Sequence, residues 1–196
     1  MDIAEIKRLR ELTGVGMTDA KKALEDSKGD FDKALAAMRK KGLTKAEKSA
    51  EREARSGIIG TYVHDNRIGV IVEVNCETDF VARNELFTTL VKDIAMQVAA
   101  SSPKYVSLSD VPSKDKEQAK SEFSEKALAE GKPKDMIKKI VDGQIDKYFS
   151  EKCLLDQVFI KNPDQTVDDY IKVHIAKLGE NIVVRRFDRM VLGEVS

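Results

Sequence analysis

The spacing of apolar residues along positions 1–41 predicts three short helices that share a small core. Gly14 is suited to end the first helix, because glycine readily adopts the left-handed conformation found at helix C-termini. Thr18 and Asp30 can cap the second and third helices, and Gly29 can end the second. The apolar positions are Ile3, Ile6, Leu9 and Leu12 on the first helix and Phe31, Ala34, Leu35 and Met38 on the third. A bundle of this size is only marginally stable alone.

The pattern changes after this module. Residues 42–56 carry many charges and no broad apolar face, which predicts a solvated, partly helical linker. Two β-branched runs then flank His64–Arg67, which is typical of a β-hairpin. A helix with a 3.6-residue apolar period follows, with Asn84 as its N-cap. Its apolar stripe, which we interpret as core, consists of Leu86, Phe87, Leu90, Val91, Ile94, Ala95 and Val98.

A final helix and strand complete a predicted core domain over residues 57–196. The helix "VDDYIKVHIAKLG" closes at Gly179, and "NIVVRRFDRMVL" is expected to join the earlier hairpin in one small antiparallel sheet. The sequence therefore predicts an α+β fold: an N-terminal three-helix module, a linker, and a small antiparallel sheet packed with helices.

Residues 113–150 interrupt this core domain with a different pattern. Acidic and basic residues alternate there, and "EGKP" at 130–133 divides the run, which predicts a protruding antiparallel helical hairpin. Its narrow apolar seam consists of Phe123, Ala127, Leu128, Met136, Ile137, Ile140 and Ile145. Such a seam buries little by itself, so it is expected to need a partner surface, either a second copy or another protein.

Composition limits the classes of function. The chain has 34 lysine and arginine residues against 34 aspartate and glutamate residues, so no overall basic excess draws in nucleic acid. The charged N-terminus lacks the apolar region of a signal peptide, and no apolar run is long enough for a membrane span. We therefore expect a cytoplasmic protein that binds neither nucleic acid nor membranes directly.

The residues that could carry covalent or metal chemistry are few. Cys76 and Cys153 form no CxxC motif, and a carboxylate beside Cys76 would raise the pKa of its thiol, so buried structural cysteines are favoured over a nucleophile. His64 and His174 lie far apart without a ligand-spacing motif, so no metal site is predicted. We expect no enzymatic activity and no cofactor.

Two glycine-containing stretches resemble nucleotide-binding motifs only superficially. "GVGMTD" at 14–19 has Asp19 where the dinucleotide fingerprint needs a third glycine, and it follows a helical pattern rather than a strand. "EGKP" at 130–133 is too short for a phosphate-binding loop and ends in proline. Both are better explained as links between helices.

The stretch "TDFV", Thr78–Val81, combines an acidic residue with an aromatic residue in a turn between a strand and a helix. Phe80 could fold back as a lid on the core. Alternatively it could be held out and inserted into a partner, where a buried ring stabilises a complex by roughly 2–3 kcal/mol. Local chemistry alone leaves both possibilities open.

Three stretches in order along the chain, "LRELTGVGMTDAKKALED", "VEVNCETDFVARNELF" and "LGENIVVRRF", resemble bacterial elongation factor Ts. The resemblance covers essentially the whole chain, and the length is similar to the short form of that family with one core subdomain. It implies a guanine nucleotide exchange factor that binds GDP-bound and nucleotide-free elongation factor Tu and acts in translation elongation. It also implies that the N-terminal module resembles the ubiquitin-associated (UBA) fold.

The resemblance implies roles for particular residues. Thr78, Asp79, Phe80 and Val81 match the segment that enters the nucleotide domain of the GTPase, where the ring is expected to disturb the magnesium site. Arg10 and Met17 match contact positions of the N-terminal module. The family often has a second methionine after Met17, where this chain has Thr18, so that contact is not expected.

The short-form resemblance and the hairpin seam also imply a homodimer formed through the core and the hairpin. Two other readings remain: a non-catalytic, UBA-like protein-binding module, and a thiol enzyme using Cys76.

Overall fold

The structure is a computed structural model that describes residues 2–130 and 134–194 of the chain. The chain forms two compact units. One contains the residues up to Ala99 together with those from Asp168 onward, and the other is Ala100–Val167.

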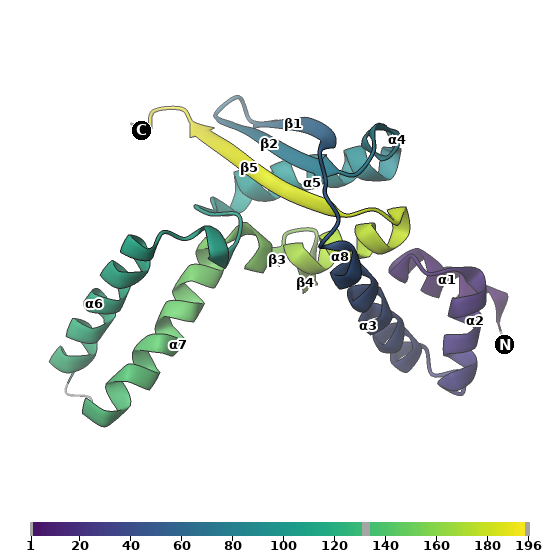
Figure 1. The fold of residues 1–196 in the computed structure, drawn as a ribbon, viewed down its shortest axis with the longest axis horizontal. Helices are drawn as coiled ribbons and strands as arrows, with labels where there is room; N and C mark the ends of the chain where they lie inside the picture. Colours follow the sequence, from purple (N-terminus) through teal and green to yellow (C-terminus); the bar gives the residue numbers. More distant parts are fainter. Residues whose placement is uncertain (1, 131–133, 195–196) are drawn as a thin grey trace. The chain divides into compact units, whose positions relative to one another are not determined.

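The N-terminal part of the first unit is a three-helix bundle, as the apolar pattern predicted (Figure 1). Its helices are α1 (Ile3–Thr13), α2 (Met17–Asp26) and α3 (Phe31–Ser49). The core consists of Ile6, Leu9, Ala20, Ala23, Leu24, Ala34 and Met38, with Phe31 and Leu35 packed against it. The predicted stripe on α1 is wrong at its ends, since Ile3 is 64% exposed and Leu12 is 44% exposed. Each step of three residues falls about 60° short of a full helical turn, so four such residues cannot share one face.

Two of the predicted helix ends are confirmed. Gly14 follows α1 in the left-handed conformation, with φ of 69°, and its N–H donates to the carbonyl of Arg10 at 2.8 Å. Asp30 precedes α3, and its Oδ1 accepts a hydrogen bond from the N–H of Lys33 at 3.1 Å. Both contacts satisfy backbone groups that a helix end leaves free.

Two other helix boundaries differ from the prediction. Helix α2 begins at Met17, before the expected cap Thr18, and Gly16 takes the N-cap position without a side-chain hydrogen bond. Helix α3 continues past residue 41, the predicted end of the module, through Gly42 to Ser49, so the first part of the predicted linker is helical. A glycine inside a helix costs only about 1 kcal/mol relative to alanine, which flanking helix-forming residues can offset. The division into residues 1–41, 42–56 and 57–196 stays a prediction.

The sheet of the first unit has three antiparallel strands in the order β1-β2-β5 (Figure 1). Strands β1 (Ser56–His64) and β2 (Ile68–Cys76) form the predicted hairpin, and β5 (Ile182–Val191) pairs with the other edge of β2. Asp65 and Asn66 in the hairpin turn have positive φ angles of 48° and 55°, which are typical of tight turns between twisted strands.

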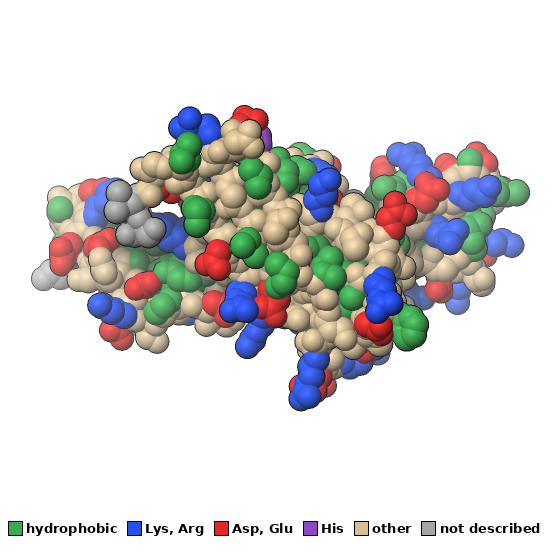
Figure 2. Space-filling view, turned by 90° about the horizontal axis from the view of Figure 1, so that it is seen from above, with side chains coloured by type: hydrophobic (Ala, Val, Ile, Leu, Met, Phe, Trp, Pro, Cys, Tyr) green, Lys and Arg blue, Asp and Glu red, His purple; other side chains and the backbone are tan. Residues whose placement is uncertain are grey.

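The two faces of this sheet differ in chemistry. Val70, Val72 and Val74 on β2 are buried, whereas the alternate residue Ile71 is 53% exposed. The register places Val63, Gly69 and Met190 in one row across the exposed face. The exposed apolar residues on this face are Ile59, Val63, Ile71, Val183 and Met190. Figure 2 shows hydrophobic side chains spread among charged ones on the surface seen from above.

Helices α5 (Glu85–Ser101) and α8 (Val167–Leu178) supply further apolar residues to the core of this unit. Asn84 caps α5 as predicted, since its Oδ1 accepts from the N–H of Leu86 at 2.8 Å. The expected core stripe is confirmed for Phe87, Leu90, Val91, Ile94, Ala95 and Val98. It is wrong for Leu86, which lies in the first turn and is 46% exposed.

Helix α5 approaches strand β1 so closely at Gly60 that an added Cβ would overlap the Cγ1 methyl of Val91. Val91 is 1% exposed, so it has no open space to move into. We expect Gly60→Ala to lower the free energy of unfolding by about 1–3 kcal/mol, because overpacking forces the helix away from the sheet. Urea denaturation measures this change. The matched control is Gly69→Ala in the same sheet, whose added Cβ has no heavy atom within 4 Å. Equal effects of the two substitutions would contradict the close approach.

The second unit contains the predicted helical hairpin, formed by α6 (Ser113–Ala129) and α7 (Lys134–Lys152) (Figure 1). The break "EGKP" includes residues 131–133, which lie outside the described residues, as do the side chains of Met136, Ile137 and Ile140. Phe123, Ala127 and Ile145 are buried or half-buried, as the seam requires. Leu128 is 52% exposed, so its assignment to the seam is wrong.

The same unit contains elements that the apolar pattern did not predict. They are the short 3-10 helices η1 (Leu108–Asp110) and η2 (Leu154–Asp156) and the strands β3 (Val158–Phe159) and β4 (Asn162–Thr166). Val111, Ala119, Phe149 and Cys153 form a buried cluster, with Tyr105, Phe123, Ile145 and Tyr148 packed against it. The aromatic residues therefore give the hairpin its own core.

The α+β class is confirmed, with N-terminal helices and a small antiparallel sheet. Within residues 2–130 and 134–194, no helix is both long enough and apolar enough to cross a membrane.

Candidate partner-binding site

The turn Thr78–Val81 leads from strand β2 into the one-turn helix α4 (Asp79–Ala82). Thr78 is the N-cap of α4, and its Oγ1 accepts a hydrogen bond from the N–H of Val81 at 3.4 Å. Ala82 is buried and Val81 is half-buried, so one side of the helix is packed. Phe80 is 82% exposed on the other side. The lid interpretation is therefore wrong, because the ring is held away from the core.

Asp79 lies beside the exposed ring and is also exposed. Its Oδ2 is 3.3 Å from Nη2 of Arg83, one helical turn later. An ion pair between two exposed side chains contributes little to stability, so it can open at small cost. The turn thus presents an aromatic ring and a carboxylate that are both available to another molecule.

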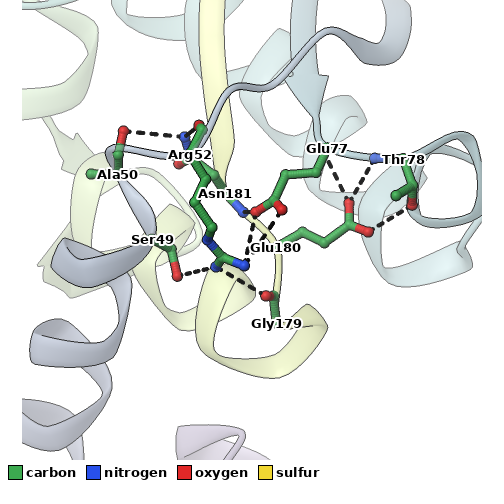
Figure 3. Close-up of polar contacts among 8 residues, drawn as sticks. All are labelled: Ser49, Ala50, Arg52, Glu77, Thr78, Gly179, Glu180 and Asn181. Atoms are coloured by element: carbon green, nitrogen blue, oxygen red, sulfur yellow. Dashed lines mark hydrogen bonds and ion pairs between the residues drawn. The ribbon is translucent and has the colours of Figure 1, made fainter.

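Glu180, which follows α8, binds the base of this turn from a distant part of the sequence (Figure 3). Its Oε2 accepts from the backbone N–H groups of Glu77 at 3.1 Å and of Thr78 at 3.0 Å. Its Oε1 accepts from the hydroxyl of Thr78 at 2.6 Å. One carboxylate therefore receives three hydrogen bonds from two consecutive residues. Hydrogen bonds to a charged group are stronger than those between neutral groups.

Glu77 makes the reciprocal contact with the loop that carries Glu180 (Figure 3). Its Oε1 accepts from the backbone N–H of Asn181 at 2.5 Å and lies 3.2 Å from Nη1 of Arg52. The side-chain amide of Asn181 donates to the carbonyl of Arg52 at 2.6 Å, and Nη2 of Arg52 donates to the carbonyl of Gly179 at 3.1 Å and to Oγ of Ser49. The end of α3, the start of α4 and the loop before β5 are joined at this point.

Cys76 lies at the end of β2 and is fully buried. Its thiol donates a hydrogen bond to the carbonyl of Thr78 at 3.1 Å. Burial raises the pKa of this thiol to about 11, and the negative charge of Glu180 adds to the effect. Burial likewise raises the pKa of Cys153 to about 11. Both thiols are therefore protonated at neutral pH, which disfavours a thiolate nucleophile.

Neither histidine belongs to a metal-ligand cluster in the part of the chain that the structure describes. Among residues 2–130 and 134–194, no group of three or more histidine, cysteine, aspartate or glutamate side chains could hold a metal ion. His174 is buried in α8, with Nδ1 2.8 Å from the carbonyl of Tyr170, and burial lowers its pKa. The hydroxyl of Tyr170 donates to Oδ2 of Asp93 on α5 at 2.8 Å. These contacts make His174 part of the helix packing.

Arg10 and Met17 are both exposed on the three-helix bundle. Arg10 lies in the last turn of α1 and Met17 is the first residue of α2, so they flank the Gly14–Gly16 link. Among the described residues, no hydrogen bond or ion pair joins either of them to residues 78–81. The structure thus groups Thr78–Val81 in one turn and places Arg10 and Met17 on the bundle.

Arg52, Glu77, Glu180 and Asn181 were not identified as site residues from the sequence. The local pattern marks Gly179 as a helix end, and the "LGEN" stretch contributes to the family resemblance. Neither signal says that Glu180 binds a backbone about 100 positions earlier. That contact is seen only in the folded structure.

Comparisons with known proteins place the sequence in a family. The sequence model for the family described as elongation factor TS matches residues 21–174. An elongation factor Ts from Thermodesulfovibrio yellowstonii is 53% identical over 189 residues, covering 96% of this chain and 94% of that protein. The elongation factor Ts of Geobacter sulfurreducens is 50% identical over 192 residues, covering 97% and 89%. That of Carboxydothermus hydrogenoformans is 51% identical over 190 residues, covering 96% and 88%. This chain therefore belongs to the elongation factor Ts family of translation elongation factors.

Proposed function

We propose that this protein is a guanine nucleotide exchange factor that binds elongation factor Tu in the cytoplasm and promotes release of GDP. The observation that carries the proposal is the 82% exposure of Phe80 on a turn whose base is held by several hydrogen bonds. An exposed ring gains hydrophobic free energy only when it is buried against another molecule. Because the base of the turn is fixed, the free energy of burying the ring can displace groups of the partner.

The mechanism combines what the resemblance to elongation factor Ts implies with the two exposed side chains of the turn. The ring of Phe80 inserts between elements of the GTPase nucleotide domain, where full burial stabilises the inserted state by about 2–3 kcal/mol. The carboxylate of Asp79 enters beside it. The resulting shift disturbs the magnesium site of the partner and weakens its hold on GDP.

Linkage sets the size of the effect. A protein that binds the nucleotide-free GTPase better than the GDP-bound form must weaken GDP binding by the same factor. Inverting a population from 99:1 to 1:99 requires about 5.5 kcal/mol. Phe80 supplies about half of this, so Arg10, Met17 and the surface of the core supply the remainder. No covalent step is needed, and the protein acts by binding rather than as an enzyme.

The decisive experiment mixes this protein with elongation factor Tu loaded with fluorescent GDP and follows release in a stopped-flow instrument. Release should accelerate with protein concentration and reach a maximal rate. A release rate that does not change at any protein concentration refutes the proposed function.

We also propose that the protein forms a homodimer through its core. In the second unit, Phe123 and Ile145 of the hairpin seam pack against the unit's own buried cluster, whereas Ile59, Val63, Ile71 and Met190 are exposed on the sheet. Light scattering over a dilution series should therefore detect a dimer. Ile71→Lys should shift it to a monomer, because a charge in an apolar contact is desolvated without a partner. Val158→Lys, at an exposed position of β3, is the control and should leave the mass unchanged. A wild-type monomer at all concentrations contradicts the dimer.

A further inference from the structure

An inserted ring can displace groups of a partner only if the turn that carries the ring keeps its conformation. Helix α4 has a single turn, and a helix that short has no stability of its own in water. The position of Phe80 therefore depends on contacts from outside α4. The hydrogen bonds of Glu180 are the strongest candidates, because they reach the two residues immediately before the helix.

The three contacts of Glu180 fix the N-terminus of α4 in two ways. Its Oε2 holds the backbone N–H groups of Glu77 and Thr78, which sets the direction in which the chain leaves β2. Its Oε1 accepts the hydroxyl proton of Thr78, which leaves the lone pairs of that oxygen free to accept from the N–H of Val81. The carboxylate thus orients the residue that caps α4.

The loop that carries Glu180 is itself held in place. The N–H of Asn181 donates to Glu77, and the carbonyl of Gly179 accepts from Arg52. The residues on either side of Glu180 therefore both have charged partners. Because this loop is held in place, the side chain of Glu180 can fix the position of the turn that carries Phe80.

We propose that Glu180 is a positioning residue for nucleotide exchange: it holds Thr78 and thereby keeps Phe80 directed outward. The contacts of Glu180 support the positioning of the turn. The effect on nucleotide release rests on the proposed exchange function. Glu180 does not itself need to contact the partner.

The first test uses the protein without any partner. Amide hydrogen exchange of Glu77 and Thr78 should be at least about tenfold faster in Glu180→Ala, because their acceptor is lost. Glu180→Gln should restore most of the protection, since its amide oxygen can accept both N–H groups and its NH2 can donate to Oγ1 of Thr78. The matched control is Glu73→Ala, which removes a carboxylate 2.7 Å from Nε of Arg186 on the same sheet. It should leave both amides protected.

The second test measures GDP release from elongation factor Tu at saturating and subsaturating concentrations. Glu180→Ala should lower the maximal rate about tenfold, the factor that one lost charge-assisted hydrogen bond represents. The half-saturating concentration should change less than about threefold, because the bundle residues are untouched. Glu180→Gln should recover most of the rate, and Glu73→Ala should match wild type.

The outcomes separate this proposal from the proposed function. Unchanged amide exchange in Glu180→Ala overturns the positioning role, whatever happens to GDP. A normal maximal rate in a Glu180→Ala protein with unprotected amides overturns it as well. A wild-type protein that fails to accelerate GDP release refutes the exchange function, and the amide measurements then still decide whether Glu180 holds the turn. Thermal unfolding of each variant verifies that it is folded, and Glu180→Gln serves as the test if the alanine variant is not.

Discussion

Replacing Phe80 by alanine is expected to lower the maximal rate of GDP release from elongation factor Tu by about 30- to 160-fold. The factor corresponds to the roughly 2–3 kcal/mol that burial of a phenylalanine side chain contributes. The complex should still form, because the bundle and the rest of the core surface remain. Stopped-flow release of fluorescent GDP over a range of protein concentrations separates the maximal rate from the half-saturating concentration.

The controls for this substitution follow from the exposure of the ring. Since Phe80 is 82% exposed, its removal should leave the thermal unfolding temperature of the free protein nearly unchanged. Val158→Ala removes another exposed apolar side chain, from the second unit, and should release GDP at the wild-type rate. Phe80→Leu should be intermediate, because it keeps part of the apolar volume. If Phe80→Ala exchanges nucleotide as fast as wild type, the ring is not the inserting group.

Deleting residues 1–41 should weaken binding to elongation factor Tu by about 100-fold or more while the remaining chain still unfolds cooperatively. The expected loss follows from the removal of the whole bundle surface with Arg10 and Met17, at about 1.4 kcal/mol for each tenfold in affinity. The fold should persist, because the contacts of Ser49, Arg52 and Asn181 all lie after the deletion. Calorimetric titration measures the affinity, and urea denaturation measures the cooperativity.

A fragment of residues 1–41 provides the complementary control. If it binds elongation factor Tu as tightly as the full chain does, the protein is better described as a UBA-like binding module. If the deleted chain loses its cooperative unfolding, the bundle belongs to the folding core and its loss says nothing about binding. The Arg10→Ala, Met17→Ala double variant then addresses the surface without removing the bundle.

Long elements with a regular apolar period could be predicted from the sequence. The three bundle helices, α5, the β1-β2 hairpin and β5 all follow from spacing, because one face of each element must be buried. The two-residue turn at Asp65 and Asn66 follows from the residues that tolerate positive φ. The failures at Ile3 and Leu12 arose because a three-residue spacing drifts around a helix of 3.6 residues per turn.

Short elements could not be predicted in the same way. Helix α4 and strand β3 are too short to show a period, and they exist because tertiary contacts hold them. The exposure of Phe80 was likewise undecided, since an aromatic residue in a turn is compatible with both a lid and an outward position. The contact between Glu180 and Thr78 joins residues about 100 positions apart, and no local pattern encodes such a pairing.

The extension of α3 through Gly42 to Ser49 affects how the bundle and the Phe80 turn reach the same partner protein. Only residues 50–55 separate the end of this helix from strand β1, and Arg52 in this segment is held by Glu77, Gly179 and Asn181, so the connection between bundle and sheet is a rod with a short anchored joint. A rod explores far less volume than a coil with the same number of residues. Once one end has docked, the other meets its target at a high local concentration, and the second contact forms with little further loss of entropy.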